Sequence, residues 1–284
     1  MKIEEKRFLI IAGQPKAGTT SLFEWLRTHP EVCAAKLKEA RFFLDEDYPL
    51  RRPIGFAGDN LQAYADLFED LSKPVLMEAT PDYLYCQTPL RVAELLPMAK
   101  VVVIVRDPIE RMISAYRFFK QRGLLGSGLT FDEYVAHQNE NAVAADTPVQ
   151  YRALDHCRLA FYLASWQSKF GERLLIIDFK RLKENGPETL RQVCDFLEIS
   201  HPSELRKSLG AENRSGMARW PGLARVYYAV SRELSMITMR VPWIRAPLRP
   251  LNALLKKGLI DLSAQEMVVP SESSVEIIKM WANR

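Results

Sequence analysis

Short apolar runs alternate along this chain with longer segments in which apolar residues recur at helical spacing. The runs hold four to six residues between turn-forming residues, which predicts buried strands. Alternation of such strands with helices predicts an α/β fold with a central, mostly parallel sheet flanked by helices. The predicted strands are 8–12, 75–78, 100–105 and 174–177, and the predicted helices are 21–26, 61–68, 89–96, 109–121, 131–138, 159–170 and 187–197.

The pattern changes after Trp220. Residues 220–262 are apolar and basic, and three prolines predict that they form short helices: Pro242, Pro247 and Pro250. Two interpretations stay open, a surface that meets a membrane or an acidic, lipid-linked acceptor, and a helical cap over the sheet with solvated basic residues. Because the sequence has no repeat, low-complexity tract or linker, we expect a single domain over 1–284, with a helical, basic C-terminal portion at about 220–284.

Composition narrows the class of protein. The chain has 284 residues, 48% of them hydrophobic, which suffices for one sizeable core. A net charge of +4 does not favour nucleic acid as a partner and fits an anionic cofactor or substrate. The four cysteines are far apart and lack C-x-x-C spacing, so we expect neither a zinc site nor a disulfide framework. No apolar run has the length of a membrane span or follows a signal-peptide pattern, and we therefore expect a cytoplasmic protein.

The first strand leads into a loop that is suited to an anion. Residues 13–20 read G-Q-P-K-A-G-T-T and connect the strand 8–12 to a helix. Backbone N–H groups at such a turn and at the helix N-terminus bind phosphate, and Gly18 would let the backbone approach it closely. Lys16 adds a positive charge, and Ala17 can contribute its backbone N–H. Three hydroxyl groups that can donate hydrogen bonds follow, those of Thr19, Thr20 and Ser21.

This loop differs from the nucleotide-triphosphate loop G-x-x-x-x-G-K-[ST], in which the lysine follows the second glycine. Here Lys16 precedes Gly18, and Thr19 stands where that lysine would be. The lysine of this loop would therefore approach a bound phosphate from the opposite side to the lysine of the nucleotide-triphosphate loop. The alternative is an ordinary strand-to-helix turn with incidental hydroxyl groups.

A second anion-binding candidate follows the strand 100–105. Arg106 stands at the strand end, and Ser114 lies on the next helix within the segment V-R-D-P-I-E-R-M-I-S-A-Y. A guanidinium recognises phosphate in a bidentate manner, and a serine adds a hydroxyl donor. The alternative for Arg106 is a salt bridge to Asp107 or Glu110.

Glu39 is the candidate general base. It lies among cations in K-L-K-E-A-R-F-F, which would keep its carboxylate ionised and able to accept a proton. From composition alone, a solvated charged segment is the better interpretation. His29 is a second candidate for the general base. Alternatively, His29 is an ordinary residue at the end of the helix.

These segments resemble those of sulfotransferases that use 3′-phosphoadenosine 5′-phosphosulfate (PAPS). P-K-A-G-T-T-S-L is similar to their 5′-phosphosulfate-binding loop, and V-R-D-P-I-E-R-M-I-S-A-Y is similar to their 3′-phosphate-binding segment, which implies that role for Arg106 and Ser114. K-E-A-R-F-F resembles the K-E-x-x-F-F segment of the glycan O- and N-sulfotransferase branch, which implies that Glu39 is the base. The resemblance spans 8–217 and implies a P-loop kinase-like fold.

Weaker matches complete the resemblance. Residues 212–219 resemble the late loop that closes over adenosine 3′,5′-bisphosphate (PAP), which makes Arg214, Ser215 and Gly216 candidate contacts. Ala79 stands where relatives of the glycan branch often have lysine, and Tyr83 would line the acceptor cleft or lie in the core.

The resemblance implies an enzyme that transfers a sulfuryl group from PAPS to a hydroxyl group or an amine, with PAP as the product. Lys16 would neutralise the leaving phosphate and Glu39 would accept the proton, with no metal required. The acceptor could be a glycan, a lipid or a small-molecule natural product. A P-loop kinase of a small molecule and a non-catalytic nucleotide-binding protein remain the alternatives.

Overall fold

The computed structural model describes residues 3–58, 61–201, 217–218, 220–240, 258, 260–261 and 266–284. The chain forms two compact units. The sheet unit comprises Met1–Asp107 and Leu159–Asn213, and the helical unit comprises Pro108–Arg158 and Arg214–Arg284.

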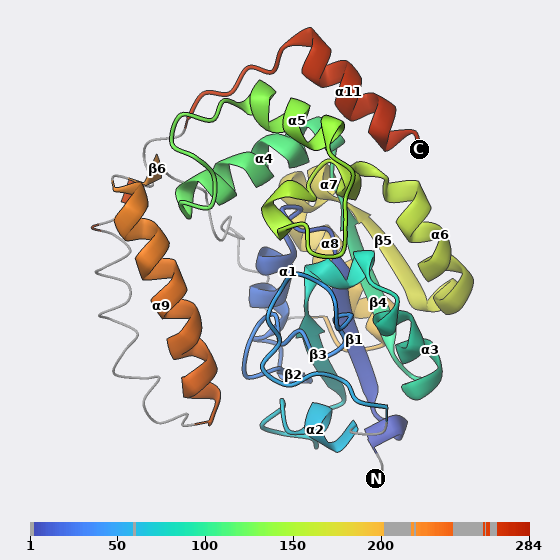
Figure 1. The fold of residues 1–284 in the computed structure, drawn as a ribbon. Coiled ribbons are helices and arrows are strands. Elements are labelled where there is room, and N and C mark those ends of the chain that lie inside the picture. Colours follow the sequence, from blue (N-terminus) through green and yellow to red (C-terminus); the bar gives the residue numbers. More distant parts are fainter. Residues whose placement is uncertain are drawn as a thin grey trace. The chain divides into compact units, whose positions relative to one another are not determined.

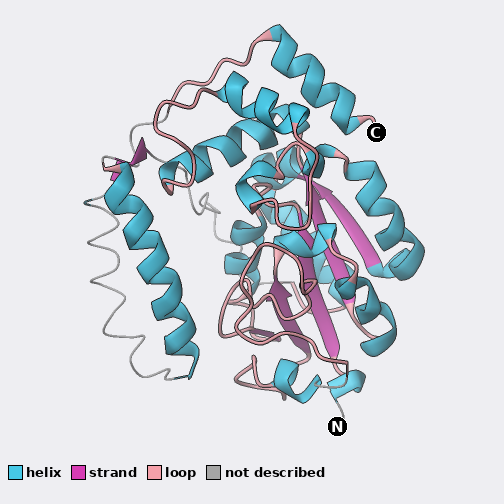
Figure 2. Ribbon diagram, in the orientation of Figure 1, coloured by secondary structure: helices cyan, strands magenta, loops and turns pink. Residues whose placement is uncertain are grey.

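The sheet unit contains five strands, and every neighbouring pair is parallel. Their order is β2-β3-β1-β4-β5, with the strands side by side in Figures 1 and 2. This confirms the predicted α/β class. The strands are β1 (Arg7–Gly13), β2 (Val32–Ala34), β3 (Val75–Ala79), β4 (Lys100–Val105) and β5 (Leu174–Asp178). The sequence predicted all of them within one residue except β2, whose three residues are too few to give a pattern.

The central strand β1 shows why these runs are apolar throughout. Phe8, Ile10 and Ala12 belong to one buried cluster, and Leu9 and Ile11 belong to another. Successive side chains of a strand point to opposite faces, so the sheet is covered on both sides. A strand buried on both faces has no polar positions that could reveal its period.

Different helices cover the two faces. The cluster that includes Phe8 receives side chains from α2, α3 and α6, and the cluster that includes Leu9 receives them from α1, α7 and α8. The helices of the sheet unit are α1 (Thr19–Leu26), α2 (Leu61–Ala65), α3 (Val92–Leu95), α6 (Leu159–Phe170), α7 (Phe179–Glu184) and α8 (Gly186–Leu197), with 3-10 turns η1 (Ile3–Glu5), η2 (Pro81–Tyr85), η3 (Thr88–Arg91) and η6 (Gly171–Arg173).

Two predicted helices are shorter than expected because their turns tighten. In the predicted helix 61–68, the amides of Leu67 and Phe68 bond three residues back rather than four, so α2 ends at Ala65. The predicted helix 89–96 begins as the 3-10 turn η3 and becomes α-helical only in α3.

The helical unit is built around α4 (Pro108–Gln121). Its core joins side chains of α4, of α5 (Phe131–Glu140) and of α11 (Glu272–Ala282). Further elements are η4 (Val149–Tyr151), η5 (Asp155–Cys157), α9 (Pro221–Arg240) and the antiparallel pair β6 (Met217–Ala218) with β7 (Ile260–Asp261). Helix α11 falls within the C-terminal portion that was expected to be helical, but its bounds were not predicted; Ser271 caps it by accepting the Ser274 N–H.

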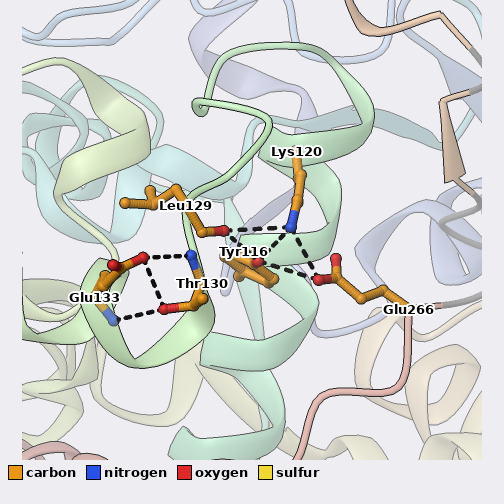
Figure 3. Close-up of polar contacts among 6 residues, drawn as sticks. All are labelled: Tyr116, Lys120, Leu129, Thr130, Glu133 and Glu266. Carbon is orange, nitrogen blue, oxygen red and sulfur yellow. Dashed lines mark hydrogen bonds and ion pairs between the residues drawn. The ribbon is translucent and has the colours of Figure 1, made fainter.

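Helix α5 begins with a capping box (Figure 3). The Thr130 hydroxyl accepts the Glu133 N–H at 3.3 Å, and the Glu133 carboxylate accepts the Thr130 N–H at 2.8 Å. The two contacts satisfy amides that have no intrahelical partner, which fixes the start of the helix.

A second polar cluster joins the segment before α11 to α4 (Figure 3). Lys120 Nζ on α4 donates to the Glu266 carboxylate at 2.9 Å and to the Leu129 carbonyl oxygen at 3.2 Å. The Tyr116 hydroxyl donates to the same carbonyl at 2.7 Å. The contact between Lys120 and Glu266 joins two segments that are 146 residues apart in sequence.

The prediction of short helices after Trp220 is wrong for 221–240. These residues form one 20-residue helix, α9, because Pro221 stands in its first turn, where proline is tolerated, and Pro242 follows its end. Residues 241–257 lie outside the described residues. Among the helices that the structure describes, none has the length and apolarity needed to cross a membrane.

The fold predicts that Gly13, the last residue of β1, cannot carry a side chain. A Cβ atom there would lie 2.8 Å from Leu84 Cδ2 and 2.9 Å from Leu84 Cβ. We expect Gly13→Ala to lower the free energy of unfolding by about 1–3 kcal/mol, as overpacking typically does. Urea denaturation measures this. Gly126→Ala is the control, because its Cβ would meet nothing within 4 Å; equal stability of the two variants would contradict the account.

Candidate active site

The loop after β1 is tied to the neighbouring strand β4 through Gln14. The Gln14 N–H donates to the Ile104 carbonyl oxygen at 2.8 Å, and the Arg106 N–H donates to Gln14 Oε1 at 3.1 Å. Gln14 is 1% exposed, so its polar groups require protein partners. The conformation of the loop therefore depends on the end of β4. No local pattern marked Gln14, because its partner Arg106 lies 92 residues away in the chain.

The structure brings two predicted site residues, Lys16 and Arg106, into contact. Arg106 Nη1 donates to the Lys16 carbonyl oxygen at 3.0 Å. The Arg106 guanidinium also lies over the Phe179 ring, 4.4 Å from its centroid. A cation over an aromatic face is stabilised by the ring quadrupole, so Phe179 holds the guanidinium beside the loop. The sequence did not predict this role of Phe179.

Gly18 is required by both its backbone and its surroundings. It is the N-cap of α1 with φ of 88°, in the left-handed region. A Cβ atom there would lie 3.0 Å from both Phe179 and Leu182. The loop, α1 and α7 therefore meet at a point where only glycine fits.

The predicted hydroxyl residues form the first turn of α1. Thr19, Thr20 and Ser21 are its first three residues, and the first amides of an α-helix have no intrahelical acceptor. These amides and the helix dipole favour an anion at this end. Ala17 is fully buried in the core, so only its backbone can contribute.

Glu39 lies at the same edge of the sheet as the loop. Its N–H donates to the carbonyl oxygen of Ala79 at 2.8 Å, and Ala79 pairs with Ile11 of β1. Parallel neighbouring strands end together, so Glu39 lies beside the end of β3 while the phosphate-binding loop follows the end of β1. The structure thus gathers the segments of Lys16, Arg106 and Glu39 at the carboxyl ends of three adjacent strands.

Two cations hold the Glu39 carboxylate. Lys38 Nζ lies 3.1 Å from Oε1, and Arg41 Nη2 lies 3.2 Å from Oε2. The Glu39 side chain is nevertheless 38% exposed. The carboxylate is therefore fixed in position and still reachable from solvent.

The backbone is strained at these residues. Among the described residues, four other than glycine have positive φ, and three belong to the candidate site: Lys16 at 72°, Glu39 at 63° and Arg41 at 61°. Such conformations are costly and persist where surrounding contacts impose them, which is common at functional sites.

Two acids near Glu39 are buried. Burial raises the pKa of Glu78 to about 7, and the Thr80 hydroxyl donates to Glu78 Oε1. Burial and the nearby Glu39 charge raise the pKa of Asp82 to about 6, while the Tyr48 hydroxyl donates to Asp82 Oδ1 at 2.8 Å. Both acids are fully enclosed or nearly so, unlike Glu39.

The structure decides two open alternatives. Tyr83 is fully buried, and its hydroxyl accepts the Phe43 N–H at 3.0 Å, so it is a core residue and does not line a cleft. His29 is also structural. Its Nε2 donates to the Ser200 carbonyl oxygen at 2.8 Å and its Nδ1 accepts the Glu31 N–H at 3.1 Å. Because His29 precedes β2, it lies at the opposite edge of the sheet from Glu39.

Four of the predicted contacts lie outside the described residues of the sheet unit. Ser114 is half-buried on α4, within the helical unit. Arg214, Ser215 and Gly216 lie outside the described residues. Their roles stay predictions based on the resemblance.

Comparison with known proteins gives a family and relatives. The Sulfotransferase domain family model matches residues 6–213. Heparan sulfate glucosamine 3-O-sulfotransferase 3B1 of Mus musculus is 33% identical over 196 residues, covering 67% of this chain and 45% of the relative. Bifunctional heparan sulfate N-deacetylase/N-sulfotransferase 4 of Mus musculus is 25% identical over 221 residues, covering 74% of this chain and 24% of the relative. The chain thus spans less than half the length of these relatives.

A solved structure supports the same assignment. The crystal structure of a sulfotransferase from Alicyclobacillus acidocaldarius matches with a TM-score of 0.58 and 26% identity, covering 81% of this chain and 93% of that one. The match confirms the predicted sulfotransferase-type, P-loop-like fold. The family model covers most of the chain and includes β1, its loop and the end of β4, and the chain therefore belongs to the sulfotransferase family.

Proposed function

We propose that this chain transfers a sulfuryl group from PAPS to a hydroxyl group or an amine of an acceptor. One observation carries the proposal: Arg106 is hydrogen-bonded to the backbone of Lys16, so two cations and the N-terminus of α1 converge on one loop. Glu39 is held at the end of the adjacent strand β3. This donor set fits a nucleotide that carries phosphate at two positions.

Each group has a distinct task. Lys16 and the first amides of α1 stabilise charge on the 5′-phosphate side, and preorganised donors of this kind contribute about 10²–10³-fold each to rate. Arg106, with Ser114, holds the 3′-phosphate. Bound PAPS supplies the sulfuryl group and a phosphate leaving group. Glu39 takes the acceptor proton as the acceptor oxygen or nitrogen forms its bond to sulfur, and the sulfur–oxygen bond to the phosphate breaks.

The kinase alternative is not favoured. A triphosphate-binding loop would have lysine directly after Gly18, where this chain has Thr19 at the start of α1. The family match and the order of the loops both support sulfuryl transfer instead.

We further propose that the acceptor is a glycan. The relatives named above include a glucosamine 3-O-sulfotransferase and an N-sulfotransferase of heparan sulfate, so hydroxyl and amine acceptors both occur among them. The test is transfer from radiolabelled PAPS to O-desulfated heparin, which offers hydroxyl groups, and to N-desulfated heparin, which offers amines. Label in either polymer supports the proposal. Label only in lipid or phenol acceptors would reject a glycan while keeping sulfuryl transfer.

The helical unit carries the feature that supports a contact with a membrane surface. Four exposed apolar side chains lie on α9 or directly before it, near the exposed Arg225: Trp220, Leu223, Val226 and Val230. Co-sedimentation with anionic phospholipid vesicles at low salt tests this contact. We expect binding that Leu223→Glu with Val226→Glu abolishes and that Ile54→Glu, a similarly exposed site in the sheet unit, leaves intact. Absence of binding by the unmodified chain would end the hypothesis.

The role of Arg106 predicts selective loss of nucleotide affinity. Arg106→Lys keeps the charge but loses the planar guanidinium, so we expect PAP to bind roughly 10- to 100-fold more weakly, with a smaller loss of affinity for ADP, which lacks the 3′-phosphate. Calorimetry measures both. Arg173→Lys is the matched control, because Arg173 also bonds a backbone carbonyl, that of Pro97, and lies over an aromatic ring, that of Phe170. Equal losses in both variants would contradict the assignment.

The role of Glu39 predicts loss of rate without loss of affinity. We expect Glu39→Gln to lower kcat by about 10²–10⁴-fold, while the Kd for PAP changes less than about twofold. Glu46→Gln is the control in the same segment, since the Glu46 side chain is 94% exposed and pairs only at 3.4 Å with Arg52. Full turnover by Glu39→Gln would remove Glu39 as the base.

A further inference from the structure

A buried polar chain lies beneath Glu39. Glu78, at the end of β3, is fully buried, and its Oε1 accepts a hydrogen bond from the Thr80 hydroxyl. Thr80 is also fully buried. The Thr80 hydroxyl oxygen in turn accepts the Arg41 N–H at 3.1 Å. Two hydrogen bonds thus connect the buried Glu78 carboxyl group, through the Thr80 hydroxyl, to the backbone of the segment that contains Glu39.

This segment is fastened to β3 and the residue after it by two amides. The Glu39 N–H bonds to Ala79 and the Arg41 N–H bonds to Thr80. Both Glu39 and Arg41 have the left-handed backbone conformation, which residues other than glycine rarely adopt. The two hydrogen bonds therefore hold a conformation that the segment would not keep by itself.

The backbone of Arg41 then determines where the Glu39 carboxylate lies. Arg41 Nη2 contacts Glu39 Oε2 at 3.2 Å, and Arg41 Nη1 donates to the Arg51 carbonyl oxygen at 3.2 Å. A shift of the Arg41 backbone would move its guanidinium and with it the carboxylate. Misplacement of a catalytic group by about 1 Å can cost on the order of 10²-fold in rate.

Burying the Glu78 carboxyl group costs free energy, which suggests that this residue has a role other than filling space. The raised pKa of Glu78 reflects the loss of solvation, which hydrogen bonds with the side chains of Thr80 and Tyr83 only partly offset. An apolar residue would fill the end of β3 without this cost. An apolar residue there could not orient the Thr80 hydroxyl toward the Arg41 amide.

We infer that Thr80, anchored by Glu78, is a positioning residue for the catalytic base Glu39. The inference rests on the proposed function, in which Glu39 accepts the proton of the acceptor. Thr80 touches neither the acceptor nor the nucleotide in this scheme; it acts through Arg41.

The test compares Thr80→Val, which removes the hydroxyl at nearly constant shape, with Thr80→Ser, which keeps it. Transfer from PAPS is measured with whichever desulfated heparin accepts label. We expect Thr80→Val to lower kcat about 10- to 100-fold with the KM for PAPS within about twofold, and Thr80→Ser to recover most of the rate. Thr189→Val is the control, because Thr189 on α8 is fully buried and its hydroxyl donates to the carbonyl oxygen of Asn185, the N-cap residue of that helix; its kcat should not change.

A double-mutant cycle separates positioning from a general structural role. If Thr80 acts through Glu39, Thr80→Val adds no further loss in the Glu39→Gln background. An equal loss in both backgrounds, or full activity of Thr80→Val, would overturn the inference. Full activity of Glu39→Gln would instead overturn the proposed base.

A second measurement needs no acceptor. The carboxyl ¹³C signal of Glu39, identified as the signal missing in Glu39→Gln, should shift in Thr80→Val and keep its position in Thr80→Ser and Thr189→Val. An unchanged signal in folded Thr80→Val, with PAP affinity retained as evidence of folding, would contradict the positioning role.

Discussion

The contact on which the site depends is the tie between the first loop and the end of β4. A loop that turns away from a buried strand leaves polar backbone groups that need partners. Gln14 meets that need on the β4 side with one backbone and one side-chain hydrogen bond, and Arg106 closes the arrangement by bonding to Lys16. The same contacts that complete the fold therefore bring together the two cations that bind phosphate in the proposed mechanism.

The site divides its chemistry between adjacent strand ends. The β1 and β4 ends carry the cations and the helix N-terminus, which suit an anionic nucleotide. Glu39 lies beside the β3 end, with its carboxylate between Lys38 and Arg41. The acids that lie deeper, Glu78 and Asp82, are enclosed and have raised pKa values, so Glu39 is the exposed one of these three carboxylates. The parallel sheet achieves this separation because its strands all end at one edge.

Sequence reasoning recovered what local pattern encodes. The continuous apolar run of β4 and the spacing of α6 were predicted with the bounds that the structure has. The loop residues Lys16 and Gly18 were found because glycine and charge between a strand and a helix are a local signal. Gln14, Phe179 and Thr80 were missed because their contacts join residues far apart in sequence, and no local pattern marks a partner that only the folded sheet supplies. Helix α9 is longer than the short helices predicted after Trp220, because the three prolines that led to that prediction all follow its last residue.

The most direct test of the account is a calorimetric titration of the unmodified chain with PAP and with ADP, both without magnesium. If Arg106 and Lys16 form one site for a nucleotide with phosphate at the 3′ and 5′ positions, PAP should bind at least about 100-fold more tightly than ADP. Equal affinities, or a preference for ADP that requires magnesium, would contradict the account and favour a kinase-like nucleotide site.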